Sequence, residues 1–207
     1  LVRELIPHEG HLFTVGRLDA DSEGLILLTN DGDLANQLMH PRYRHTKTYR
    51  VLVEGTPAPS TLDTWRSGVM LDDQRTAPAR VRVLEEGKHD TWLEIVMREG
   101  RKRQIRRVAA MLGHPVTRLI RVAIGPVQLG ELRPGEWRYL TDQELRVLGH
   151  ATEAPTRLDA RRPRRSGAGG AQRTRAQRTR ARNGCLRPFD GLAANVLIGG
   201  GERAKAP

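Results

Sequence analysis

A run of acidic and glycine residues near the N-terminus holds the first side chains whose types and spacing suit chemistry. It reads Gly-Arg-Leu-Asp-Ala-Asp-Ser-Glu-Gly over residues 16–24 and leads directly into an apolar segment. Carboxylates such as those of Asp19 and Asp21 can act as nucleophiles, as general bases or as metal ligands. Loops held by a rigid scaffold often carry reactive groups, so this acidic loop is a candidate functional site.

Two simpler interpretations of the acidic loop have to be weighed. Asp19, Asp21, Glu23 and Gly24 match positions 1, 3, 5 and 6 of a calcium-binding loop. Position 12 is Asn30 where a bidentate Glu is required, and a strand-like segment follows, so calcium is disfavoured. Asp19 can also cap its own turn by accepting backbone N–H groups, which is the interpretation that the local sequence alone favours.

A second candidate is the basic segment 98–107, Arg-Glu-Gly-Arg-Lys-Arg-Gln-Ile-Arg-Arg, which holds six cations in ten residues. The segment opens a predicted helix, where cations oppose the helix dipole and are locally unfavourable. It therefore calls for an anionic partner, either phosphates or a carboxylate. A solvated basic face would explain Lys102 and Arg103, but less easily Arg106, which follows the apolar Ile105.

Other candidate side chains give weaker signals. Tyr49 heads a predicted strand, where most tyrosines are half-buried packing residues. His8 and His11 lack a nearby third ligand, and His114 before Pro115 is typical of a turn, so we predict no metal site. Neither GxGxxG nor GxxxxGK[ST] occurs, which leaves no sign of a dinucleotide or a nucleoside triphosphate.

Short alternating elements between residues 12 and 148 must position these groups. Hairpins mixed with helices predict an α+β domain around an antiparallel or mixed sheet, because a doubly wound fold would alternate strand and helix throughout. Asp31 and Ser60 are expected helix caps. The patterns predict strands at 24–29, 48–54, 79–84, 91–97, 118–124 and 137–140, and helices at 31–39, 60–67, 101–112 and from Asp142 onward.

Composition narrows the class of protein. The chain of 207 residues has 35 Lys and Arg against 24 Asp and Glu, a formal charge of +11 that favours a polyanionic partner such as nucleic acid. Cys185 is the single cysteine, so an intrachain disulfide and a cysteine zinc cluster are excluded, which fits a reducing cytoplasm. No apolar run approaches the roughly 20 residues that span a bilayer, and we expect no membrane association.

The charge is concentrated at the C-terminal end. Residues 1–150 hold 22 cations and 20 anions, whereas residues 151–207 hold 13 cations and 4 anions. We therefore predict a folded domain over 1–150 and a basic low-complexity tail over 151–207, disordered at least over 151–184. The tail is either an arm that adds phosphate contacts or a dispensable solvated segment, and its composition favours the second. Residues 192–198 form a short apolar patch with no assigned role.

Three segments in order resemble a known family. They read GRLDADSEGLILLTNDGDLANQLMHP, KTYRVLVEG and REGRKRQIRRVAAMLGHPVTRLIRVAIGPV. Together they resemble the bacterial ribosomal RNA pseudouridine synthases of the small-subunit synthase A and large-subunit synthase B type, over residues 15–148. The resemblance implies the pseudouridine synthase fold, with a central mixed, mostly antiparallel sheet, flanking helices and a catalytic cleft.

The resemblance also implies roles for individual side chains. Asp19 is the expected catalytic carboxylate, Tyr49 the expected base for the C5 proton, and Arg106 the expected ion-pair partner of Asp19. An arginine partner keeps a carboxylate ionised and fixes its direction. The expected substrate-binding residues are Arg17, which braces the gap left by the displaced nucleotide, Ile105, which packs on the base, Lys47 and Arg103.

The implied reaction converts a uridine of ribosomal RNA into pseudouridine by breaking the N1–C1′ bond and joining C5 to C1′. The uridine must be flipped into an enclosed pocket, and a redox-neutral isomerisation needs no cofactor. The segment 118–122 is more similar to the large-subunit branch. We expect a cytoplasmic monomer that binds ribosomal RNA. The alternative is a non-catalytic basic protein that binds RNA or ribosomes, in which Asp19 is only structural.

The sequence departs from the family pattern at two points. Ser22 stands where Thr is common, which keeps a hydroxyl group. The small S4-like RNA-binding domain and a first strand with Lys-Pro-x-Gly are not found ahead of the GRLD motif, and the chain opens at Leu1. We therefore expect that the sequence is an N-terminally truncated catalytic domain.

Overall fold

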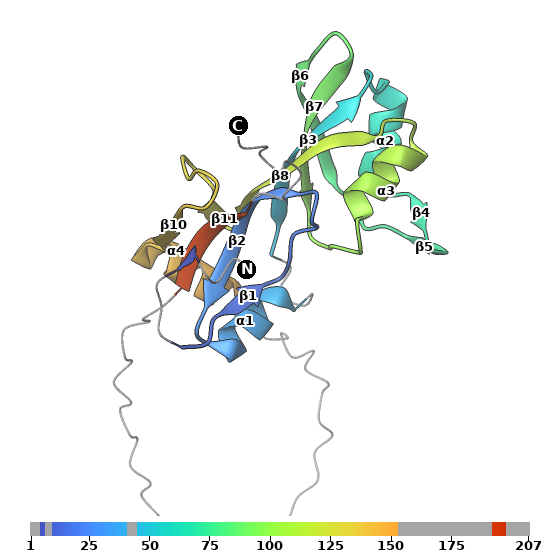
Figure 1. Cartoon of the computed structure of the whole chain (residues 1–207). Coiled ribbons are helices and arrows are strands. Elements are labelled where there is room, and N and C mark those ends of the chain that lie inside the picture. The colour runs from blue at the N-terminus through green and yellow to red at the C-terminus, as the bar shows by residue number, and fades with distance from the viewer. Residues whose placement is uncertain (1–4, 7–9, 41–44, 153–191, 198–207) are drawn as a thin grey trace, which may run out of the picture. The chain divides into compact units, whose positions relative to one another are not determined.

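The computed structural model describes residues 5–6, 10–40, 45–152 and 192–197 (Figure 1). Within them lie four helices and eleven strands. The helices are α1 (Gly32–Met39), α2 (Pro59–Ser67), α3 (Gln104–Met111) and α4 (Asp142–Thr152). The strands are β1 (Phe13–Val15), β2 (Glu23–Thr29), β3 (Lys47–Glu54), β4 (Met70–Leu71), β5 (Gln74–Arg75), β6 (Arg80–Glu86), β7 (Asp90–Met97), β8 (Val116–Ile124), β9 (Val127–Gln128), β10 (Trp137–Tyr139) and β11 (Leu192–Leu197).

Nine of these strands form one mixed sheet in the order β10-β11-β2-β8-β3-β7-β6, with β1 beside β2 and β9 beside β8. All of its described pairings are antiparallel except that of β2 with β8. The short β4 and β5 form a separate hairpin. The predicted α+β architecture with a mixed, mostly antiparallel sheet and flanking helices is therefore confirmed.

The pattern of buried and exposed side chains explains why these segments form strands. In β2 every residue after Glu23 is buried, as expected for a strand covered on both faces. In β7 burial alternates, with Thr91, Leu93, Ile95 and Met97 inward, which is the period of a strand with one buried face. The predicted hairpin of residues 79–84 and 91–97 is confirmed as β6 and β7.

Of the two predicted N-terminal helix caps, Asp31 is confirmed and Ser60 is not. Asp31 caps α1 as expected, because its Oδ1 accepts the backbone N–H of Leu34 at 2.9 Å. The expected cap at Ser60 is wrong: α2 begins at Pro59 after Ala58, without a side-chain cap. Proline suits the first helical position because its φ is preset and its missing N–H would have had no helical partner.

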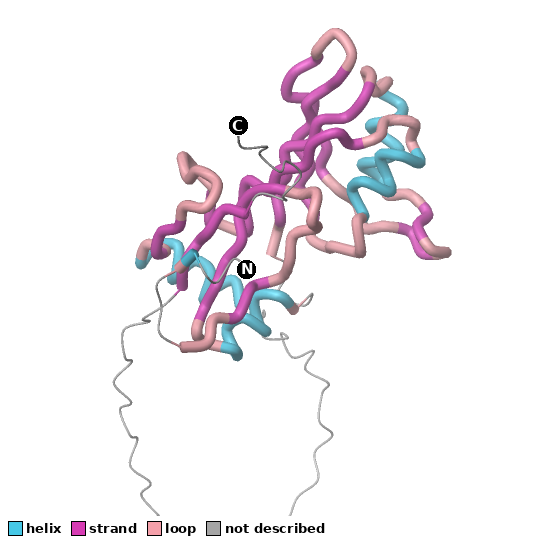
Figure 2. Tube along the Cα trace, in the orientation of Figure 1, coloured by secondary structure: helices cyan, strands magenta, loops and turns pink. Residues whose placement is uncertain are grey.

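The helices lie beside the sheet (Figure 2). Two apolar clusters of side chains hold them there. In one, α2 and α3 pack on β3, β6, β7 and β8 through side chains such as Trp65 and Val108. In the other, α1 and α4 pack on β1, β2, β8 and β9 through Leu38 and Leu148. Strand β8 contributes to both clusters, so its middle residues lie at their junction.

The structure corrects the predicted domain boundary. Helix α4 continues to Thr152, and the backbone of β11 pairs with β2 over six residues and with β10 over three. Residues 192–197, predicted as part of the tail, therefore belong to the sheet. The rest of the predicted tail lies outside the described residues. No helix in the described part of the chain is long and apolar enough to cross a membrane.

Candidate active site

The acidic loop lies between β1 and β2 and forms one wall of a cleft. Ser22 donates its backbone N–H to the carbonyl of Asp19 at 2.9 Å, which closes a tight turn. Asp19 is half-buried and lines the cleft, while Arg17 is exposed at its rim. Among the described residues, the Asp19 carboxylate makes no hydrogen bond or ion pair. It therefore does not cap its own turn by accepting backbone N–H groups.

The cleft has a volume of about 490 Å³, within the range of small-molecule sites. Four parts of the sequence meet in it: the acidic loop, the start of β3, the turn into α3 and the middle of β8. Its lining includes the side chains of Arg17, Asp19, Lys47, Tyr49, Ile105 and Arg121. Arg103 also lines the cleft.

The ion pair expected between Asp19 and Arg106 is not the one that forms. Arg106 directs its guanidinium at Asp21, with Nε 3.3 Å from Asp21 Oδ2 and Nη2 donating to the Asp21 carbonyl at 2.5 Å. Its Nη1 donates to the carbonyl of Val116 at 3.1 Å. Because Arg106 is tied to α3 and β8, it reaches the outer part of the turn, two residues beyond Asp19.

Arg103 binds the same carboxylate. Its Nη1 and Nη2 donate to the two carboxylate oxygens of Asp21 at 2.8 and 2.7 Å. This hydrogen bond is the main cause that lowers the pKa of Asp21, and it raises the pKa of Arg103. Arg103 has φ +51° just before α3, a left-handed conformation that turns its side chain toward the acidic loop.

Two more arginines of the basic segment are also engaged by the protein. Arg101 donates to the carbonyls of Leu71, Gln74 and Arg75 and so holds the β4–β5 hairpin. Arg107 forms an ion pair with Asp72. The sequence left phosphates or a carboxylate open as the anionic partner of this segment. In the structure, carboxylates form ion pairs with four of its arginines: Arg101, Arg103, Arg106 and Arg107.

Arg121 was not among the predicted site residues. It is 3% exposed, and its Nε donates to the carbonyl of Leu25 at 2.7 Å while its Nη1 donates to that of Arg17 at 3.3 Å. It thus links β8 to both ends of the loop that carries Asp19. The signal was present in the sequence, because Leu119, Arg121 and Ala123 share the buried face of one strand.

Lys47 and Tyr49 project from β3 on the same face, since they are two residues apart in a strand. Tyr49 pairs with Arg121 in the register of β3 and β8. Burial lowers the pKa of Lys47, and the charge of Arg121 lowers it further. Both predicted residues therefore lie in the cleft with Asp19.

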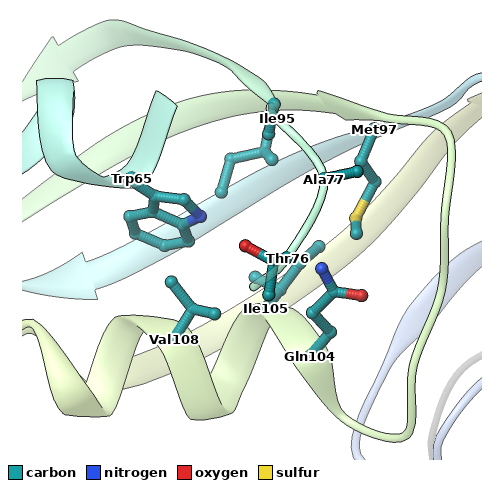
Figure 3. Close-up of a pocket in the computed structure, with 9 residues that line it drawn as sticks. Trp65, Thr76, Ala77, Ile95, Met97, Gln104, Ile105 and Val108 are labelled. Carbon is teal, nitrogen blue, oxygen red and sulfur yellow. The ribbon is translucent and has the colours of Figure 1, made fainter. Parts of the chain in front are cut away.

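Between α3 and the sheet the packing leaves little space (Figure 3). The gap among Trp65, Ile95, Ile105 and Val108 has a volume of about 10 Å³, enough for one water-sized sphere. It cannot admit a nucleobase. Ile105 presents one side to this gap and another to the large cleft, which is where a base would contact it.

Within the described residues no group of three or more His, Cys, Asp and Glu side chains is arranged to hold a metal ion. The side chains that line the cleft include a carboxylate, a phenol, two ammonium groups and guanidinium groups.

The sheet and the cleft together define the class of protein. A solved structure described as a pseudouridylate synthase has a TM-score of 0.66 and 33% identity, covering 71% of this chain and 64% of that one. The family model described as RNA pseudouridylate synthase matches residues 2–111. The chain belongs to the RNA pseudouridylate synthase family.

Curated relatives agree with this assignment. The chain is 47% identical over 137 residues to an uncharacterized RNA pseudouridine synthase of Aquifex aeolicus, covering 66% of this chain and 55% of that protein. It is 47% identical over 142 residues to the ribosomal large subunit pseudouridine synthase E of Xanthomonas campestris, covering 61% and 76%. The alignment thus spans about half the length of the Aquifex protein and three quarters of the Xanthomonas one.

Proposed function

We propose that this protein isomerises a specific uridine of ribosomal RNA to pseudouridine, and that the target lies in the large subunit. The observation that carries the proposal is the Asp19 carboxylate, which has no hydrogen bond or ion pair among the described residues and lines a cleft of nucleotide size together with Tyr49. The name of the Xanthomonas relative, a large-subunit synthase, supports the choice of ribosomal subunit. The motifs GRLD, KTY and RQIR support the synthase A and B branch of the family.

The reaction begins with a flipped uridine whose sugar lies against Asp19. The N1–C1′ bond breaks and its electron pair stays on the uracil, while Asp19 either bonds to C1′ or removes a proton from C2′. The uracil then turns and C5 bonds to C1′, while the Asp19–C1′ bond breaks or Asp19 returns the proton to C2′. Tyr49 takes the C5 proton, and N1 of the uracil gains a proton. An unpaired carboxylate suits either role of Asp19, because no cation blocks its approach to the sugar.

The remaining predicted residues serve binding. Ile105 packs on the base, Arg17 at the exposed rim fills the space that the flipped nucleotide leaves, and Lys47 contacts the base from β3. Arg103 and Arg106 act on the site through Asp21 and are positioning residues. We expect the protein to work as a cytoplasmic monomer, without a cofactor, because the isomerisation is redox-neutral.

The test compares the wild-type chain with Asp19→Asn on unmodified large-subunit rRNA tritiated at uridine C5. Isomerisation releases the C5 hydrogen, so tritium appears in water. We expect release by the wild type, none by Asp19→Asn, and equal RNA binding by both. If the folded wild type binds RNA but releases no tritium, the protein is instead a non-catalytic RNA-binding protein. Small-subunit rRNA as a parallel substrate tests the choice of subunit.

A further inference from the structure

The floor of the cleft holds a buried cation with one unused donor. Arg121 uses Nε and Nη1 to bind the carbonyls of Leu25 and Arg17, but its Nη2 is buried without a hydrogen-bond partner among the described residues. A buried donor that lacks an acceptor costs free energy, and more so when it belongs to a charged group. The fold therefore keeps this donor ready for a group that it does not itself supply.

A second cation lies beside the first. Lys47 is half-buried in the cleft, and its Nζ lies 3.4 Å from the position that a Cβ on Gly100 would occupy. Lys47 forms no ion pair over residues 10–40 and 45–152. The two like charges are near enough for that of Arg121 to lower the pKa of Lys47. Within the described part of the chain, Asp19 is the one carboxylate that shares the cleft with them.

The reaction creates a second anion at this place. When the N1–C1′ bond breaks, the electron pair on N1 spreads over the two carbonyl oxygens of the uracil, which become strong hydrogen-bond acceptors. Donors fixed in a buried site stabilise such developing charge far better than water does, because they need no reorganisation.

We propose that Lys47 and Arg121 form a leaving-group site that donates N–H groups to the oxygens of the departing uracil. This inference rests on the proposed function. It makes both residues part of the catalytic machinery: Asp19 meets the positive charge that develops on the sugar, and the two cations meet the negative charge on the base. It also explains how the detached uracil is retained until C5 bonds to C1′.

A backbone phosphate fits the pair less well. The RNA chain must leave the cleft in both directions, so its phosphates stay near the mouth, whereas Arg121 is 3% exposed. An exposed cation, Lys102, also lines the cleft and is available for a phosphate. A phosphate site and a leaving-group site predict different kinetics for variants of Lys47.

The test uses two RNA substrates that differ at one atom. Fluorine at C5 of the target uridine withdraws electrons, so the departing base carries its charge more easily and depends less on the cations. Single-turnover consumption of the target nucleoside is measured after nuclease digestion, for the full chain and for Lys47→Met. We expect Lys47→Met to slow uridine consumption about 100-fold and fluorouridine consumption no more than about 10-fold, with unchanged RNA affinity.

Matched variants complete the design. Lys47→Arg keeps the cation and should recover most of the rate, while Lys88→Met, an exposed lysine in the β6–β7 turn, should behave as the wild type. Arg121→Lys should show the same substrate dependence as Lys47→Met if it folds, and Lys47→Met decides the question if it does not.

Equal losses with both substrates would overturn the inference, and so would a loss of RNA affinity with a flatter salt dependence, which indicates a phosphate site. In either case wild-type turnover would leave the proposed function intact. A wild type that consumes neither substrate would instead refute the proposed function.

Discussion

Arg103 and Asp21 form a two-pronged ion pair that joins the start of α3 to the loop carrying Asp19, with N···O distances of 2.8 and 2.7 Å. The residues are 82 positions apart in the sequence. Arg106 approaches the same carboxylate, so among the described residues two guanidinium groups converge on Asp21 and none on Asp19. The loop is fixed from its outer side, and the carboxylate that faces the cleft stays free.

The first prediction concerns this ion pair. Asp21→Asn removes the charge that both arginines bind, so the loop loses its orientation, and we expect the single-turnover rate to fall about 10- to 100-fold. The Asp21 side chain is 45% exposed, so the free energy of unfolding should change by no more than about 1 kcal/mol. Asp72→Asn breaks the Arg107 pair on the same helix and serves as the control. A wild-type rate in Asp21→Asn would show that the pair does not position the loop.

The second prediction concerns Gly24, where β2 meets β8. A Cβ there would lie 2.3 Å from the backbone oxygen of Arg121, and φ is +110°. Gly24→Ala should therefore cost at least about 3 kcal/mol in urea unfolding, because the two strands must separate. Gly113→Ala, at φ +84° with nothing within 4 Å of its Cβ, tests the backbone effect alone and should cost about 1–2 kcal/mol. A similar loss of unfolding free energy in both variants would contradict the close approach of Gly24 to the backbone of Arg121.

The third prediction concerns pH and the start of α4. The side-chain hydrogen bond from Arg138, followed by those from the backbone and hydroxyl of Thr141, lowers the pKa of Glu144 from 4.5 to about 2. Because the pKa is lower in the folded state, Glu144 stabilises the protein above about pH 4.5 and loses this contribution as the pH falls toward 2. The contribution is about 1–2 kcal/mol after allowing for the partly exposed Arg138.

Glu144→Gln measures this contribution directly. Its free energy of unfolding should lie below that of the wild type at pH 7, and the difference should disappear near pH 2. Glu85→Gln removes an exposed carboxylate on β6 and should follow the wild-type curve. A constant difference between Glu144→Gln and the wild type across this range would exclude the linkage.

The fourth prediction concerns the arginine-rich segment 161–182. If this segment binds phosphates, replacing its arginines with glutamine weakens RNA binding and reduces the slope of log affinity against log salt by about 0.7–0.9 for each phosphate that is no longer bound. Single-turnover rates at saturating RNA should not change. An unchanged slope would show that the segment does not contribute to binding. The variant keeps β11, which a simple truncation would remove from the sheet.

Much of the fold could be predicted from local pattern. The alternation in β7, the continuous apolar run of β2 and the stripe of Ile105, Val108 and Ala109 in α3 depend only on neighbours in the sequence. The motifs around Asp19, Tyr49 and Arg106 indicated the family and the residues that meet in the cleft. Strand β11 could not be predicted, because its pairing with β2 joins segments that the sequence separates by more than 150 residues.

Residue types and local pattern are enough to identify the available groups: one acidic loop, one basic segment and an arginine within the strand expected at 118–124. The tertiary structure decided how they pair. Arg106 was expected at Asp19 but lies at Asp21, because its guanidinium is also held by the carbonyl of Val116 and reaches only the outer part of the turn. Arg121 reaches the cleft because β8 runs beside both β2 and β3. Such choices depend on distances of a few ångströms between remote segments, which residue types and spacing do not specify.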